Sequence, residues 1–171
     1  MNQVKSSLAT VDFADPQYPS LREHSESFPS LLHRHGEEVN IPTGLVVSPD
    51  DNIRAALAEK LLLIGIAPTL ATNLAESRDH VVGGGLSVVL CEDLLPDGRY
   101  SEILRLKQRA RNNAPVIVVS RTGDWQEYFA AIALGAYDFL GYPPIPGELQ
   151  RVIRHSLAEC NHQQHSLAAS T

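Results

Sequence analysis

Cysteine is scarce in this sequence, which has only Cys91 and Cys160 among its 171 residues. Two thiols cannot build a disulfide framework or a four-ligand zinc site, and their scarcity favours a reducing compartment. There is no run of about 18 apolar residues of the kind that a transmembrane helix needs. Asn2 and Gln3 are polar, where a secretory signal leads into an apolar stretch. We therefore expect a cytoplasmic protein with no membrane partner.

Positive charge is also in short supply. The chain has 14 Lys and Arg against 20 Asp and Glu, which gives a net charge of −6. That balance disfavours unselective binding to phosphate backbones, so no nucleic acid partner is expected. A composition with 43% hydrophobic and 20% charged residues is typical of a globular protein with one core.

The composition divides the chain into three parts. Residues 1–42 carry four prolines and many serines without sustained periodicity, which predicts a disordered N-terminal arm. Residues 43–160 alternate between apolar strand patterns and amphipathic helix patterns. Residues 161–171 are polar, and we expect them to form a flexible C-terminal tail.

The middle part predicts five strand and helix units. The expected strands cover 45–47, 67–71, 86–91, 115–119 and 137–141. The segment 115–119 is apolar on both faces, as a central strand of a parallel sheet must be when helices cover both sides. We expect an α/β fold of the flavodoxin-like type, a doubly wound parallel sheet of five strands in the order 2-1-3-4-5 with helices on both faces. In the helix predicted for Asp124–Leu134, Trp125, Tyr128 and Phe129 are expected mostly in the core.

Four segments occur in an order that resembles a known family. They are Leu45–Arg54 (LVVSPDDNIR), Val88–Gly98 (VVLCEDLLPDG), Val116–Ser120 (VIVVS) and Gly135–Pro143 (GAYDFLGYP). Together they resemble the CheY-like receiver domain of two-component response regulators. The resemblance covers about residues 44–160.

The resemblance implies a phosphorylation site that this sequence does not fully keep. A working receiver has an acidic pair for Mg²⁺, a phosphoacceptor aspartate, and a lysine that neutralises the phosphoryl oxygens. Ser48 and Pro49 stand at the acidic-pair positions, Glu92 at the phosphoacceptor position, and Tyr142 at the lysine position. Since none of these supplies the usual group, we expect a degenerate pseudo-receiver.

Other residues follow the family pattern more closely. Ser120 matches the switch hydroxyl of the family. Phe139 matches the aromatic residue whose rotamer changes together with that hydroxyl. Ser120 either bonds Glu92 or caps the turn before the next helix. Tyr142 matches a position that precedes a cis peptide bond to proline.

The role of Glu92 has two interpretations. Its carboxylate reaches one methylene further than that of aspartate, about 1.5 Å, and so could mimic a phosphoryl group. It could equally be an ordinary acid at a strand end. A separate alternative is that Asp93 accepts phosphate, with Mg²⁺ held by Asp50 or Asp51 as metal ligand.

These observations predict an atypical, stand-alone receiver-like protein that is not an enzyme, needs no cofactor and acts by protein-protein interaction. Its expected partners are a histidine kinase or an output protein, or a second copy bound through the helices Asp124–Leu134 and Gly147–Cys160. The alternative is a phosphoaccepting receiver of a phosphorelay that uses Asp93 with Mg²⁺. A flavin or nucleotide enzyme is disfavoured, because Gly83–Gly85 precedes a strand instead of opening a helix. A basic face, which is either a partner surface or an ordinary solvated helix surface, is formed by Arg99, Arg105, Lys107, Arg109 and Arg111.

Overall fold

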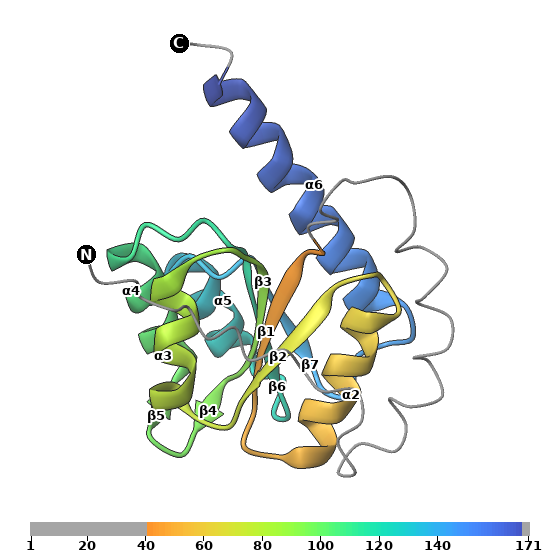
Figure 1. Ribbon diagram of the computed structural model, residues 1–171. Coiled ribbons are helices and arrows are strands. Elements are labelled where there is room, and N and C mark those ends of the chain that lie inside the picture. The colour runs from red at the N-terminus through yellow and green to blue at the C-terminus, as the bar shows by residue number, and fades with distance from the viewer. Residues whose placement is uncertain (1–40, 169–171) are drawn as a thin grey trace, which may run out of the picture. The chain divides into compact units, whose positions relative to one another are not determined.

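A parallel sheet of five strands forms the centre of the described domain. The computed structural model describes residues 41–168, and describes side chains as far as Cys160 (Figure 1). The strands are β1 (Thr43–Val47), β2 (Ala67–Ala71), β3 (Leu86–Glu92), β6 (Val116–Ser120) and β7 (Asp138–Gly141). Their spatial order is β2-β1-β3-β6-β7, which confirms the predicted flavodoxin-like topology.

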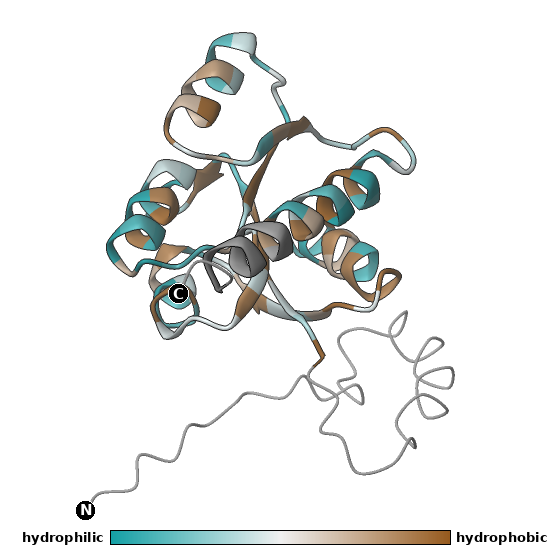
Figure 2. Ribbon diagram, turned by 90° about the horizontal axis from the view of Figure 1, so that it is seen from above, coloured by the Kyte–Doolittle hydropathy of each residue, from teal (hydrophilic) through white to brown (hydrophobic). Residues whose placement is uncertain are grey.

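Helices cover both faces of this sheet (Figures 1 and 2). Their bounds are α2 (Asp51–Leu62), α3 (Leu74–Gly83), α4 (Tyr100–Arg109), α5 (Trp125–Ala133) and α6 (Glu148–Ala168). One core cluster joins the sheet to α2 and α6, and a second joins it to α3, α4 and α5. None of the helices in residues 41–168 is both long and apolar enough to cross a membrane.

The central strands are buried on both faces, as their sequences predict. In β6, Val116 and Val118 belong to the cluster under α3, α4 and α5, whereas Ile117 and Val119 belong to the cluster under α2 and α6. All four side chains are at most 1% exposed. Because neighbouring side chains on a strand point to opposite faces, a strand between two helical layers must be apolar throughout.

Aspartates cap the start of two of the helices, α2 and α5. Asp50 caps α2 and accepts hydrogen bonds from the backbone amides of Asn52 at 2.9 Å and Ile53 at 3.2 Å. Asp124 caps α5 through the amide of Gln126 at 2.8 Å. These caps satisfy amides that have no partner within the helix, and the helix start predicted at Asp124 is confirmed.

Two differences from the predicted boundaries lie outside the sheet. Helix α6 continues past Cys160 to Ala168, so the helix ends later than predicted, within the expected tail at 161–171. The reason is that no glycine or proline follows Cys160 to stop it. A hairpin of β4 (Leu94–Leu95) and β5 (Gly98–Arg99), which was not predicted, lies between β3 and α4. Most of the predicted arm at residues 1–42 lies outside the described residues.

Two of the three aromatic residues of α5 lie outside the core, contrary to the prediction, whereas Tyr128 packs against it. Trp125 is 73% exposed and Phe129 is 66% exposed, while Ala131 is the residue of α5 that is buried. The helical spacing was right, but spacing alone does not say which face of a helix meets the sheet. Small Ala131 lets α5 approach the sheet closely, so that Trp125 and Phe129 are left outside.

Close packing at Gly44 leads to a stability prediction. A Cβ atom at this position would lie 2.8 Å from Leu61 Cδ1 and 3.0 Å from Ile66 Cγ2, both in the core. We expect Gly44→Ala to lower the free energy of unfolding by about 1–3 kcal/mol, because the added methyl overpacks the core. Urea unfolding measures this change. Gly83→Ala is the matched control, since a Cβ there meets nothing within 4 Å, and an equal loss in both variants would contradict the prediction.

Candidate functional site

The predicted site residues converge at the carboxyl ends of β1, β3 and β6. Ser48 directly follows β1, Glu92 ends β3, and Ser120 ends β6. All three are buried, with 0%, 4% and 1% of their surfaces exposed. This is the edge at which open α/β sheets keep their sites. The structure therefore brings together three of the residues at which the resemblance places a site.

Glu92 is held by two groups. The Ser48 hydroxyl donates a hydrogen bond of 2.8 Å to Glu92 Oε1. The guanidinium of Arg121 lies 3.3 Å from Glu92 Oε2 and 3.5 Å from Oε1. A carboxylate that is 95% or more buried would be costly without such partners. Ser48, at an acidic-pair position, thus acts as a donor to the residue at the phosphoacceptor position.

Arg121 is the site residue that the sequence analysis missed. It follows Ser120 and also lies 3.5 Å from Asp50 Oδ2, so one cation bridges two carboxylates. Its side chain is 54% exposed, which means that water screens part of this attraction. The family pattern directs attention to the lysine position before the proline. The available signal was a basic residue directly after the strand that ends in Ser120.

Ser120 contacts Asp93 and not Glu92. Its hydroxyl donates a hydrogen bond of 2.8 Å to Asp93 Oδ2 and accepts one of 3.2 Å from the amide of Thr122. The interpretation that Ser120 bonds Glu92 is therefore wrong, and the interpretation that it caps the following turn is confirmed. Asp93 itself is only 8% exposed, and its backbone amide continues the β3–β6 ladder by donating to Val119 O at 3.0 Å.

The acidic residues after β1 have other roles. Asp50 caps α2, and Asp51 pairs with Arg54 and has 84% of its side chain exposed. Pro49 is exposed, whereas Arg54 is buried and donates to Ser48 O at 2.7 Å. In the part of the chain with described side chains, no three His, Cys, Asp or Glu residues group in a way that could hold a metal ion.

Tyr142 stands at the edge of the site. The expected cis peptide bond between Tyr142 and Pro143 is present. The Tyr142 amide donates to Ser120 O at 2.7 Å, and its side chain packs against the core cluster under α2 and α6. A phenol there brings no fixed positive charge to Glu92.

A series of aromatic contacts leads from buried Phe139 to the molecular surface. Phe139 is buried, and its ring centroid lies 6.5 Å from that of Tyr100 and 6.4 Å from that of Tyr128. Tyr128 in turn lies 5.9 Å from Trp125 and 5.5 Å from Phe129. All these pairs are edge-to-face, a favoured geometry for aromatic rings. Buried Phe139 is thus in contact with Tyr128, whose ring also contacts exposed Trp125 and Phe129.

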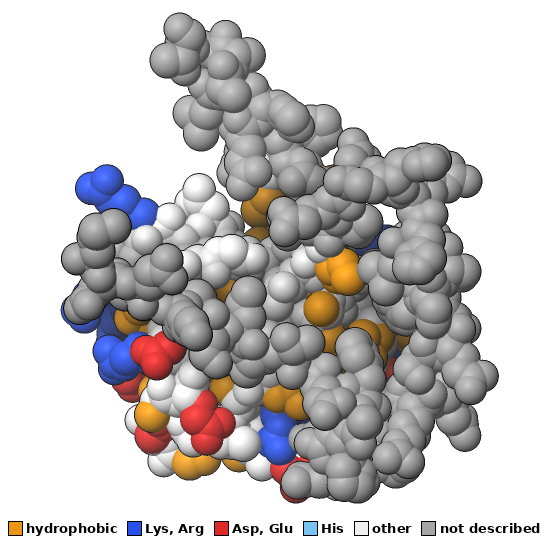
Figure 3. All heavy atoms as spheres, viewed as in Figure 1, with side chains coloured by type: hydrophobic (Ala, Val, Ile, Leu, Met, Phe, Trp, Pro, Cys, Tyr) orange, Lys and Arg blue, Asp and Glu red, His pale blue; other side chains and the backbone are white. Residues whose placement is uncertain are grey.

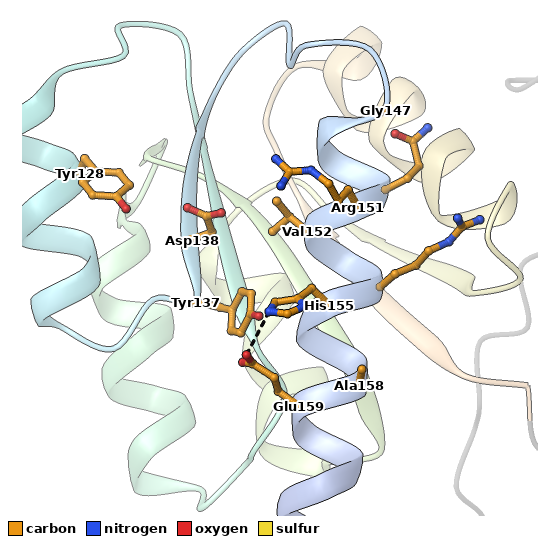
Figure 4. Close-up of a pocket in the computed structure, with 11 residues that line it drawn as sticks. Tyr128, Tyr137, Asp138, Gly147, Arg151, Val152, His155, Ala158 and Glu159 are labelled. Carbon is orange, nitrogen blue, oxygen red and sulfur yellow. Dashed lines mark ion pairs between the residues drawn. The ribbon is translucent and has the colours of Figure 1, made fainter.

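A broad hollow lies between α5, β7 and α6 (Figure 4). Its volume is about 1000 Å³, and its lining includes Tyr128, Tyr137, Arg151 and other polar residues. On its α6 side His155 Nε2 lies 3.1 Å from Glu159 Oε1. Burial, with a smaller effect of the neighbouring Glu159, raises the pKa of Tyr137 to about 12. The Tyr137 phenol therefore stays neutral near pH 7.

Comparisons with known proteins were made for sequence and fold. No protein-family model matches the chain. The DNA-binding transcriptional regulator NtrC of Rhizobium meliloti is 30% identical over 117 residues, which is 68% of this chain and 24% of NtrC. The uncharacterized transcriptional regulatory protein YkoG of Bacillus subtilis is 28% identical over 115 residues, which is 67% of this chain and 50% of YkoG. The chain spans a quarter to a half of the length of these curated relatives.

Solved structures match the fold over nearly their full length. The receiver domain of the Francisella response regulator 1452 has a TM-score of 0.63 at 21% identity, with 69% of this chain and 98% of that chain covered. The beryllofluoride-activated receiver domain dimer of NtrC4 has a TM-score of 0.63 at 26% identity, with the same coverage. In sequence and in fold, the described part of this chain is similar to the receiver domains of response regulators.

Proposed function

We propose that this protein is a pseudo-receiver, a signalling module that acts through protein-protein contact without phosphorylation of an aspartate. The observation that carries the proposal is the pairing of Glu92. Its carboxylate is buried and already engaged by Ser48 at 2.8 Å and by Arg121 at 3.3 Å. The space and charge that a phosphoryl group would require are thereby taken up by groups of the chain itself.

The chemistry of phosphoryl transfer supports the same proposal. The reaction needs cations that neutralise charge on the transferred oxygens and an acceptor oxygen that is free to attack. Ser48 and Pro49 bring no negative charge to a metal ion, and Tyr142 brings no positive charge to a phosphate. Arg121, the cation that pairs with Glu92, is shared with Asp50. In this proposal Glu92 is a permanent part of the site, so the charge of the site does not change by phosphorylation.

The output surface in this proposal is the exposed aromatic pair on α5, Trp125 and Phe129. Tyr128 contacts both rings and also contacts buried Phe139, so the pair is physically connected to the core beside the site. Large exposed aromatic side chains are enriched in protein interfaces. We propose that a second copy of this chain binds here, through α5 and α6. A histidine kinase or an output protein is the other class of partner that this surface would suit.

Intact mass spectrometry tests whether the site accepts phosphate. After incubation of the full chain with Mg²⁺ and a small phosphodonor such as acetyl phosphate, we expect no stable gain of one phosphoryl group. The reason is that Glu92 and Asp93 are both buried and hydrogen-bonded. A response regulator that is phosphorylated under the same conditions serves as the positive control. A mass gain that disappears in Asp93→Asn would overturn the proposal in favour of the phosphoaccepting alternative.

A further inference from the structure

A second, smaller hollow lies between α3 and α4. Its volume is about 200 Å³, and its lining residues are Leu74, Arg78, Glu102, Arg105, Leu106 and Arg109. Figure 3 shows Lys and Arg side chains gathered on the side of the molecule where α3 and α4 lie, with acidic side chains beside them. None of these lining residues belongs to the Glu92 site, so this hollow is an independent feature of the fold.

The lining has an excess of positive charge. Three guanidinium groups, those of Arg78, Arg105 and Arg109, face one carboxylate, that of Glu102. In the part of the chain with described side chains, none of the three arginines belongs to an ion pair. Like charges four residues apart on a helix, as Arg105 and Arg109 are, repel one another. The fold itself therefore gains nothing evident from placing these charges together.

The helices hold the arginines at fixed positions along the hollow. Glu102, Arg105 and Arg109 share one face of α4, because their spacing of three and four residues matches the helical period. Arg78 stands one turn after Leu74 on α3, across from them. The partly buried side chains of Leu74 and Leu106 pack against the core and anchor the two helices beneath the charges.

The start of α3 does not contribute to this attraction. The carboxylate of Asp97 accepts hydrogen bonds from the amides of Leu74 at 2.8 Å and Ala75 at 2.9 Å. These bonds lower the pKa of Asp97, so that its negative charge already occupies the helix terminus at neutral pH. Any anion in the hollow would therefore be bound by the three arginine side chains and not by the start of α3.

We propose that the hollow between α3 and α4 binds a small oxyanion of the phosphate class that carries two or more negative charges. Guanidinium groups bind phosphate oxygens through paired N–H donors, and three of them can surround such a group. The six lining residues carry three positive charges and one negative charge, so positive charge prevails in the lining, as the binding of an anion requires. The volume of about 200 Å³ accommodates a linked pair of phosphate groups.

Calorimetric titration of the full chain with pyrophosphate tests this proposal, with inorganic phosphate in a second arm, at constant ionic strength. We expect saturable binding of one pyrophosphate and weaker binding of phosphate. Arg105→Gln and Arg109→Gln should each weaken pyrophosphate binding at least about tenfold, as the loss of a charged hydrogen-bonding partner does. Arg111→Gln is the matched control, since it removes the same charge just beyond α4 without lining the hollow.

Three results would overturn the proposal. The first is the absence of saturable binding of pyrophosphate. The second is an equal effect of Arg111→Gln and Arg105→Gln, which would indicate general charge attraction instead of a site. The third is a protein that sediments together with vesicles of equal parts phosphatidylcholine and phosphatidylglycerol but does not bind pyrophosphate. That result would indicate a surface for lipid headgroups. Thermal unfolding of each variant verifies that the exposed substitutions leave the domain folded.

Discussion

Replacing Arg121 with alanine is expected to lower the free energy of unfolding by about 1–3 kcal/mol, because buried Glu92 would lose its cation. Glu92 is 4% exposed and would keep the hydrogen bond from Ser48 but lose the guanidinium of Arg121. The cost stays below that of breaking a fully buried pair, since water already reaches the half-exposed arginine. Urea unfolding near pH 7 measures the change.

A double-mutant cycle separates this pairing from a general effect of charge. In Glu92→Gln the buried side chain is neutral, so the further change Arg121→Ala should cost less than it does in the original protein. Arg154→Ala on α6 is the control, because Arg154 is exposed and belongs to no ion pair among residues 41–160. Strictly additive losses would show that Arg121 does not stabilise Glu92.

The double substitution of Trp125 and Phe129 by serine is expected to abolish self-association at concentrations where the original protein forms dimers. Exposed aromatic residues at the centre of an interface commonly contribute about 2 kcal/mol or more each, which corresponds to more than tenfold in affinity. Stability should change by less than about 1 kcal/mol, since 73% and 66% of these side chains are already in solvent. Sedimentation velocity over a concentration series measures the association.

Val82→Ser provides the matched control for this experiment. Val82 lies on α3 and is 54% exposed, so its substitution removes exposed apolar surface away from α5. We expect self-association of this variant to equal that of the original protein. If the original protein stays monomeric at high concentration, the proposed dimer is excluded, and the α5 surface would then have to serve a different protein.

The order of the strands and the location of the site were predictable from the sequence, because each depends on short-range patterns. Alternating strand and helix periods fix a doubly wound sheet, and the carboxyl ends of β1, β3 and β6 bring Ser48, Glu92 and Ser120 together. The caps at Asp50 and Asp124 are local hydrogen bonds, which an aspartate just before a helical pattern predicts.

The parts that could not be predicted depend on contacts between distant segments. Arg121 meets Glu92 because it directly follows β6, which pairs with β3 in the sheet, so the contact depends on which strands are neighbours and on the side-chain rotamer of Arg121. The bond from Ser120 to Asp93 instead of Glu92 depends on side-chain rotamers at adjacent strand ends. The outward aromatic face of α5 depends on how closely Ala131 lets that helix approach the sheet.

The position of Arg121 within the polypeptide has a consequence for regulation. A metal ion or a phosphoryl group can be added to a protein and removed again, but a side chain in a loop is present from the moment of synthesis. If Arg121 supplies the balancing charge, the cell cannot switch this pocket by supplying or withdrawing a donor. Its signal would then follow how much of the protein is made and how quickly it is degraded.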